Sequence, residues 1–111
     1  MARQPKALDY TSGTVTNSAV TLTEMGSALV TTIPNGARSF CGTVESGAIR
    51  ARGDGTAPTA GEGQLISENG IIYLGESEFS SMEFIRVTGD AEIRGHFYNV
   101  EVDVLIGKVG S

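Results

Sequence analysis

The residues able to carry catalytic or metal chemistry are few and widely spaced. His96 is the only histidine, Cys41 is the only cysteine, and the chain has no tryptophan. One Cys and one His cannot supply the four ligands of a structural zinc site. A Ser–His–Asp site would have to use His96, but the sequence has no Gly-x-Ser-x-Gly elbow. The sequence therefore predicts no catalytic residue, no metal site and no cofactor.

Acidic and glycine-rich segments give two weaker signals. Glu76, Glu78 and Glu83 form an acidic string that could hold calcium with help from backbone carbonyls. A solvated acidic face is the simpler interpretation, and the segment DGTAPTAGEGQL lacks the alternating Asp or Asn ligands of an EF-hand loop. The same segment lacks the glycine spacing, between a strand and a helix, of phosphate-binding loops.

The stretch RARGDGTAPTAGEG, Arg50–Gly63, contains Arg-Gly-Asp at residues 52–54. This tripeptide can be a cell-adhesion signal, but common loop residues also produce it by chance. The glycines on either side of Asp54 indicate a turn in which the Asp54 carboxylate bonds the local backbone. Gly53–Gly63 would form an 11-residue loop, longer than the usual two to six or so. Because long loops on rigid β scaffolds often carry contacts, we expect a strand connection that is used in subunit contact.

Turn residues interrupt the chain often. Glycine makes up 15 of 111 residues, about twice the average share of roughly 7%, and no stretch of helical length carries an unbroken apolar stripe. About eight short strands are therefore expected, in an all-β fold: a small antiparallel β-sandwich or jelly-roll-like barrel with Gly-rich turns. The expected strands are Ala7–Thr11, Ala19–Thr23, Leu29–Ile33, Arg38–Glu45, Ala48–Arg52, Gln64–Ser67, Ile71–Leu74, Ser81–Thr88 and Ala91–Ile106.

Several local features accompany these strands. Pro34–Gly36 should be a turn and Glu68–Gly70 a hairpin turn. Within Ala91–Ile106 the apolar residues change parity, so a bulge or bend is expected near Tyr98 and Asn99. Ser81–Thr88 has large apolar groups on both faces, which is typical of a central strand.

Side-chain positions follow from the same patterns. His96 should point outward together with Arg94 and Tyr98. Cys41 follows the apolar Phe40 and is expected to be buried, as free cysteines often are.

The charge distribution limits the choice of partners. The net charge is −5 and the pI is about 4.7, which disfavours nucleic acid. Residues 1–52 carry five basic and three acidic groups, and residues 53–111 carry three basic and ten acidic groups. Either the two halves face different ways, so that one face could meet an acidic neighbour, or their strands interleave. No apolar run approaches the roughly 18 residues of a membrane span, and MARQPKALDY lacks the apolar segment of a signal peptide.

The segment Ile49–Tyr98 resembles small proteins encoded among the structural genes of tailed bacteriophages. The resemblance is carried by RARGDGTAPTAGEGQLI after Ile49, by GIIYLGE and by MEFIRVTGDAEIRGHFY. The front half fits loosely, through KALDY, TVT and VTLT, and the acidic tail VEVDVLIGKVGS departs from the pattern. The resemblance implies a β-sandwich that decorates or cements a capsid, or sits at a head or tail vertex, often as a trimer.

This resemblance sets the functional expectations. It implies a non-enzymatic virion protein at the capsid surface or head vertex, made in the host bacterial cytoplasm. Its partners would be the major capsid protein or other virion subunits, with no nucleic acid and no membrane. Residues 1–8 would form an extended arm and residues 9–111 a single β-sandwich domain. The expected capsid or subunit contacts are Arg3, Lys6, Arg50, Arg52, Asp54, Thr56, Pro58 and Thr59.

Two other classes of function are open. A receptor- or glycan-binding module of the virion would use exposed aromatic side chains, for which Tyr73, Phe79, Phe97 and Tyr98 are the candidates. A small enzyme would depend on His96 and the acidic string, and no motif supports it.

Overall fold

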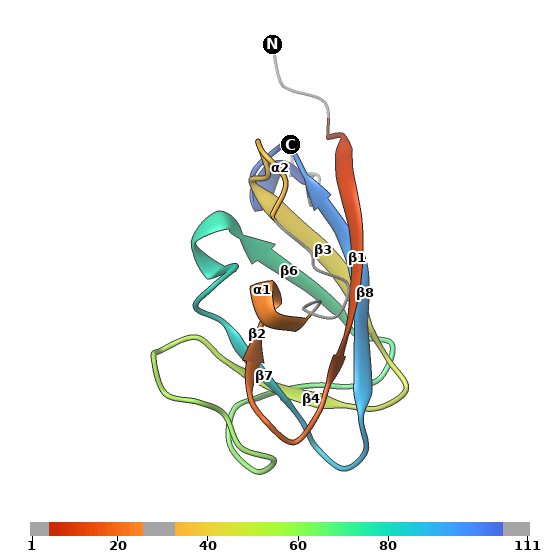
Figure 1. Cartoon of the computed structure of the whole chain (residues 1–111), viewed down its shortest axis with the longest axis vertical. Helices are drawn as coiled ribbons and strands as arrows, with labels where there is room; N and C mark the ends of the chain where they lie inside the picture. Colours follow the sequence, from red (N-terminus) through yellow and green to blue (C-terminus); the bar gives the residue numbers. More distant parts are fainter. Residues whose placement is uncertain (1–4, 26–32, 106–111) are drawn as a thin grey trace.

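Two antiparallel four-stranded sheets make up the computed structural model, which describes residues 5–25 and 33–105 (Figure 1). The strand order of sheet A is β1 (Ala7–Val15), β8 (Ala91–Tyr98), β3 (Ser39–Glu45) and β6 (Ile71–Gly75). The order of sheet B is β2 (Val20–Thr21), β7 (Glu83–Arg86), β4 (Ile49–Arg52) and β5 (Gln64–Ile66). The helical segments within these residues are single turns: α1 (Leu22–Met25), η2 (Glu76–Glu78) and α2 (Val102–Leu105). The predicted all-β sandwich is confirmed, and the sheets do not close into a barrel.

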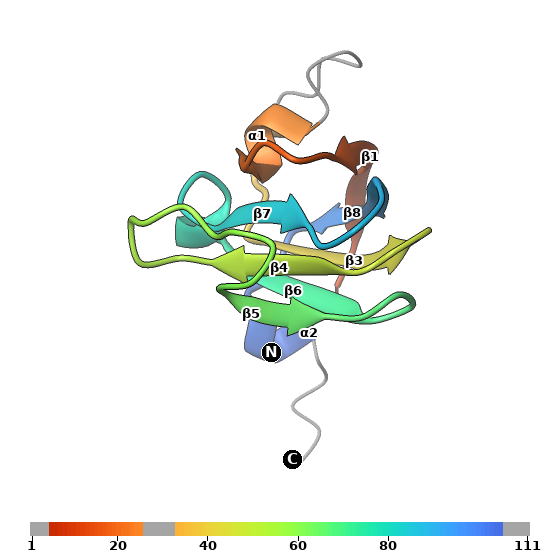
Figure 2. The same ribbon diagram turned by 90° about the horizontal axis from the view of Figure 1, so that it is seen from below.

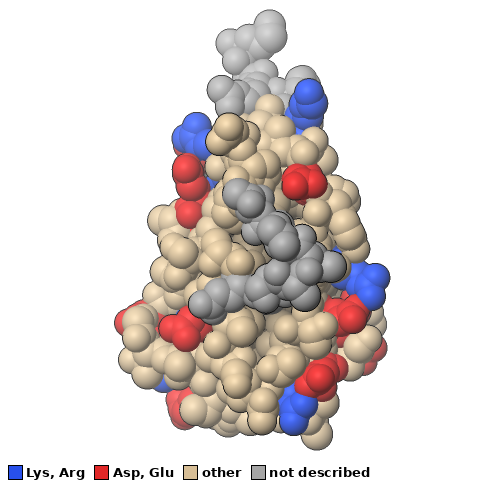
Figure 3. All heavy atoms as spheres, in the orientation of Figure 1, with Lys and Arg blue, Asp and Glu red and all other residues tan. Residues whose placement is uncertain are grey.

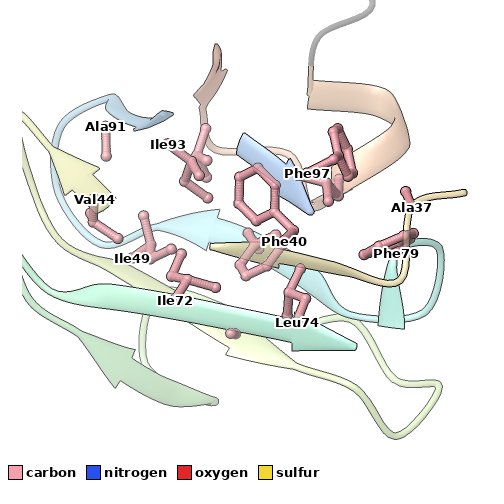
Figure 4. Packing of buried hydrophobic residues seen from close by; sticks show 14 residues of the cluster. Ala37, Phe40, Val44, Ile49, Ile72, Leu74, Phe79, Ala91, Ile93 and Phe97 are labelled. Carbon is pink, nitrogen blue, oxygen red and sulfur yellow. The ribbon is translucent and has the colours of Figure 1, made fainter. Parts of the chain in front are cut away.

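The core fills the space between the sheets with alternate side chains from their strands (Figure 4). In β3, Phe40 and Val44 point inward, and in β8, Ile93 and Phe97 do the same. All four phenylalanines of the chain are buried: Phe40, Phe79, Phe84 and Phe97. Burying a large apolar side chain stabilises the fold by about 1.5–3 kcal/mol, so this aromatic set is a major part of the driving force.

The middle of the chain follows the sequence patterns closely. β3, β4, β5 and β6 agree with the predicted strands to within one residue at each end. The turn at Pro34–Gly36 is confirmed, since the Ala37 amide donates to the Pro34 carbonyl at 3.2 Å and Gly36 has a φ of +85°. β7 is shorter than Ser81–Thr88 but lies between β2 and β4, so its central position is confirmed.

The first part of the chain departs from prediction. β1 runs to Val15, four residues beyond the predicted end. The predicted strand Ala19–Thr23 is wrong beyond Thr21, because the backbone turns into α1 at Leu22 and buries that side chain. Most of the predicted strand Leu29–Ile33 lies outside the described residues, and Ile33 itself is not in a strand.

The last predicted strand is also wrong beyond Tyr98. β8 ends there, and the run of alternating valines that follows belongs to a connection and to α2. Val100 is buried in that connection, and Val102 packs near Gly75. The apolar residues change parity at this point because the chain leaves sheet A after Tyr98 and no longer alternates as a strand. The register irregularity at this end of sheet A lies on β1, between Ala7 and Asp9, opposite Tyr98 and Phe97.

The turn Glu68–Gly70 is not a hairpin turn, because β5 belongs to sheet B and β6 to sheet A. It crosses between the sheets and is attached to β3: the Asn69 amide donates to the Val44 carbonyl at 2.7 Å, and the Val44 amide donates to the Gly70 carbonyl at 3.0 Å. Turn residues predict that the chain reverses, but they do not say which strands pair.

Strands from the two halves of the chain alternate in both sheets. In sheet A and in sheet B alike, a strand from residues 1–52 lies beside one from residues 53–111. The unequal charges of the two halves of the sequence are therefore not separated onto different faces. Acidic and basic side chains lie side by side on the visible surface (Figure 3). This confirms the interleaved alternative.

Candidate functional site

The loop Gly53–Gly63 connects the paired strands β4 and β5, as predicted, and projects away from the sheets (Figure 2). Arg50 of β4 supports the loop by two hydrogen bonds to its backbone. Its Nε donates to the Ala60 carbonyl at 3.2 Å, and its Nη1 donates to the Gly63 carbonyl at 3.0 Å. Arg50, predicted as a contact residue, thus supports the loop, and a contact with a partner stays a prediction.

Arg52 and Asp54 pair with each other at the start of the loop. Arg52 Nε and Nη2 donate to the two Asp54 oxygens, each at 2.9 Å. Asp54 Oδ1 also accepts from the Thr56 amide at 3.3 Å, which confirms the predicted bond to the local backbone. The two charged groups that an adhesion receptor would engage are therefore occupied within the loop.

The tip of the loop is a tight turn. The Thr59 amide donates to the Glu62 carbonyl at 2.9 Å, and the Glu62 amide returns to the Thr59 carbonyl at 3.1 Å. Pro58 is buried, so it anchors the tip and is not a surface contact as predicted. Three of the predicted contact residues in the loop are exposed: Asp54, Thr56 and Thr59. The Thr59 hydroxyl accepts a hydrogen bond from the Gly61 amide at 3.3 Å.

The ion pair in the loop gives a pH prediction. The hydrogen bond from Arg52 holds the pKa of Asp54 below its ordinary value, with a smaller contribution from the Thr56 amide. Because the pKa is lowered on folding, the contribution of the pair is present above the ordinary carboxyl pKa and is lost as the pH falls through the folded value. We expect an NMR titration of the Asp54 carboxyl to show this lowered midpoint. In Arg52→Gln the midpoint should rise toward the ordinary value; equal midpoints in both proteins would contradict the pairing.

The predicted N-terminal contacts lie elsewhere. Arg3 lies outside the described residues, and Lys6 is tied to Asn99: the Lys6 amide donates to Asn99 Oδ1 at 2.8 Å, and the Asn99 amide donates to the Lys6 carbonyl at 3.2 Å. β1 begins at Ala7, so the last two residues of the predicted arm are part of sheet A. The start of β1 and the Gly53–Gly63 loop lie at opposite ends of the molecule (Figure 1). The predicted contact residues thus form two separate groups.

A second surface, which we call the tyrosine face, lies on the outer side of sheet A and carries Tyr10, Cys41, Tyr73, His96 and Tyr98. These include all three tyrosines, the only histidine and the only cysteine of the chain. Strand register aligns four of them in one row across the sheet, in the order Tyr10, His96, Cys41, Tyr73. The Tyr10 and His96 rings meet edge to face with centroids 5.2 Å apart. Tyr10 is 50% exposed and Tyr73 is 41% exposed.

The tyrosine face corrects the predicted set of exposed aromatics. Phe79 and Phe97 are only 5% and 1% exposed, so they belong to the core. Tyr73 and Tyr98 do lie on the outer face, and the outward position of His96 is confirmed. Tyr10 was not predicted. Residue type could have identified Tyr10 as exposed, because a tyrosine hydroxyl favours a position where it reaches water or a hydrogen-bond partner. Phenylalanine has no such group.

Cys41 is partly exposed on this face, which corrects the expected buried thiol. Desolvation raises the pKa of the Cys41 thiol, and a hydrogen bond with Tyr73 opposes this rise. Since the thiolate is the nucleophile, the environment does not activate Cys41.

A shallow groove of about 400 Å³ runs over the tyrosine face between Tyr10, Tyr98 and Ile71. One side carries a charged cluster in which Arg94 pairs with Glu92 and, at 3.3 Å, with Glu45. These carboxylates, Glu92 first, raise the pKa of Arg94, and the Tyr10 hydroxyl also bonds its guanidinium. The groove therefore joins aromatic surface to fixed hydrogen-bonding groups.

The opposite end of the outer face is covered. Ser39, in the first position of β3, is fully buried, and a Cβ on its neighbour Gly75 would lie 3.8 Å from Val102 of α2. The turn α2 thus closes this end of the sheet and leaves the row from Tyr10 to Tyr73 open.

The acidic string does not converge. Glu76 pairs with Arg38 at 3.3 Å, while Glu78 accepts the Gly75 amide at 2.8 Å. In residues 5–25 and 33–105, no three His, Cys, Asp or Glu side chains gather into a group that could hold a metal ion. The geometry favours the interpretation of the acidic string as a solvated acidic surface.

Comparison with protein-family models, with curated proteins and with solved structures gives no match. Among the described residues, every helix is too short to cross a membrane.

Proposed function

We propose that the chain is a non-enzymatic structural protein of a tailed-bacteriophage virion: a capsid decoration or cement protein that binds the capsid surface as an oligomer, most simply a trimer. Its partners are the major capsid protein or neighbouring virion subunits. The proposal begins from the resemblance of Ile49–Tyr98 to phage structural proteins. It is supported by the structure of the Gly53–Gly63 loop, which lies near the start of that segment.

The observation that carries the proposal is that this loop is exposed and yet internally braced. Arg50 bonds two of its carbonyls, and Arg52 and Asp54 close its first turn. A loop ordered before binding loses less conformational entropy in the complex. Such a loop is better suited than a flexible linker to a stable contact with a rigid surface.

The positions of the two predicted contact groups fit cementing. The braced loop and the start of β1 lie at opposite ends of the molecule (Figure 1). A protein held at both ends can link two neighbouring capsid subunits. Oligomerisation would also cover the open edge of sheet B, where Leu65 of β5 is 51% exposed.

The test combines light scattering with co-sedimentation on emptied heads of the encoding phage. We expect trimers that co-sediment with heads. The double variant Thr56→Glu/Ala60→Glu, which places charge on exposed loop positions, should lower head occupancy at least tenfold, because buried unpaired charge is costly. Ser80→Glu, exposed outside the loop, should bind normally.

A deletion tests the other end. Removing residues 1–5 leaves Lys6 and β1 in place and should abolish stable attachment if the arm contributes the second contact. A monomer that ignores heads, or full occupancy by the loop variant, would contradict the proposed function. Full occupancy by the deletion alone would remove the arm from it.

A further inference from the structure

We propose that the tyrosine face is a binding site for a neutral oligosaccharide, which lies along the groove on the outer side of sheet A and extends beyond it to Tyr73 of the edge strand β6, beside Cys41. The site is separate from the Gly53–Gly63 loop, and the proposal holds whether or not the chain is attached to a capsid.

The first argument is the separation of aromatic residues by type. The four phenylalanines are buried, and the three tyrosines stand on one outer face with the only histidine. A tyrosine ring offers an apolar surface while its hydroxyl stays in hydrogen-bonding contact. A pyranose ring has the matching character, with C–H groups on its faces and hydroxyl groups around its rim.

The second argument is geometric. Tyr10 and Tyr73 sit on β1 and β6, the two edges of sheet A, with β8 and β3 between them. At a strand spacing of about 4.8 Å, they are about 14 Å apart across the sheet. An extended ligand is needed to reach both, so a short oligosaccharide fits the row better than a single sugar.

The third argument is the charged cluster beside the groove. Arg94 is shared between Glu45 and Glu92, and the Thr43 hydroxyl donates to Glu45 at 3.3 Å. Two carboxylates against one guanidinium leave the cluster negative, which disfavours phosphates, sulfates and acidic sugars. A sugar hydroxyl can donate to Glu45 and accept from Arg94, and such charge-assisted hydrogen bonds are strong.

The same cluster argues against an apolar protein partner. The side chains of Arg94 and Glu45 are 45% and 43% exposed, and a dry interface would have to strip water from both. Hydroxyl groups of a saccharide replace that water directly. A proline-rich peptide, which also docks on aromatic grooves, is the alternative occupant that the experiment separates.

The experiment is an amide NMR titration of the purified chain with maltohexaose, cellohexaose and mannohexaose, each to about 5 mM, which reaches millimolar Kd values. We expect at least one to shift amides of β1, β3, β6 and β8. Tyr10→Ala and Tyr73→Ala should each raise the Kd about three- to tenfold, the range typical of one aromatic contact. Ser80→Ala, at an exposed position outside sheet A and outside the groove, should leave it unchanged.

Circular dichroism of each variant confirms that it is folded, and the two tyrosine variants test the site independently. The proposal is overturned if none of the three hexasaccharides shifts these amides, or if both tyrosine variants bind like the native chain. It is also overturned if a proline decapeptide shifts the tyrosine face and the saccharides do not. Because no heads are present, failure here leaves the capsid proposal untouched.

Discussion

Gly95→Ala is expected to prevent the chain from folding stably at 25 °C. A Cβ at Gly95 would lie 2.2 Å from the Cys41 carbonyl oxygen, 2.5 Å from Gly42 Cα and 2.8 Å from Phe40 Cζ. Two of these three atoms are backbone of the neighbouring strand β3, so relief requires breaking the β3–β8 ladder. Overpacking of a tight site typically costs 1–3 kcal/mol, and backbone clashes of this kind belong to the rare losses above about 4 kcal/mol.

The reason lies in the centre of sheet A. Gly42 and Gly95 face each other across β3 and β8, and the Phe40 ring lies against the space that both leave empty. Urea denaturation followed by circular dichroism measures the effect. Gly89→Ala is the matched control, because a Cβ there meets nothing within 4 Å. We expect it to change the free energy of unfolding by less than about 1 kcal/mol. A native-like midpoint for Gly95→Ala would contradict the packing described here.

Phe97→Ala is expected to lower the free energy of unfolding by about 3–5 kcal/mol, the usual range for removing a buried aromatic ring. Phe97 is 1% exposed, and its ring centroid lies 5.2 Å from that of Phe40 and 5.3 Å from that of Phe79. The substitution therefore removes two aromatic contacts and leaves a cavity between the sheets (Figure 4).

The adjacent residue supplies the control. His96 lies on the same strand but points outward onto the tyrosine face. His96→Ala should therefore lower the free energy of unfolding by less than about 1 kcal/mol. Similar losses from both substitutions, measured by the same denaturation, would mean that the inside–outside alternation of β8 is wrong.

Local order was largely predictable. Alternation of side chains along β8 correctly placed His96 outside, because the two-residue period is a property of any strand. On β3 the same period separated Phe40 from Cys41, but the expected burial of Cys41 was wrong, because Phe40 occupies the buried face. The turn at Pro34–Gly36 was predictable for the same kind of reason, since proline and glycine restrict their own backbone angles. The valines after Tyr98 led to the wrong prediction of a continuing strand. A short alternating run in a connection has the same pattern as a strand, and only the packing distinguishes them.

The candidate sites depended on contacts that no local pattern contains. Arg50 was expected to face a partner, but its carbonyl partners Ala60 and Gly63 are reached only after the loop folds back. Tyr10 joins Tyr73 only because β8 and β3 lie between β1 and β6 in sheet A.

By itself, the sequence determined that this chain is all-β, where β3, β4, β5 and β6 begin and end to within one residue, and that His96 lies on the outward face of β8. These features follow from turn chemistry and side-chain period, which act over a few residues. Only the tertiary structure decided that Glu68–Gly70 crosses between sheets, that Pro58 and the phenylalanines are buried, and that the tyrosines share one face. Those outcomes depend on which distant strands pair, and pairing is settled by the packing of the whole core.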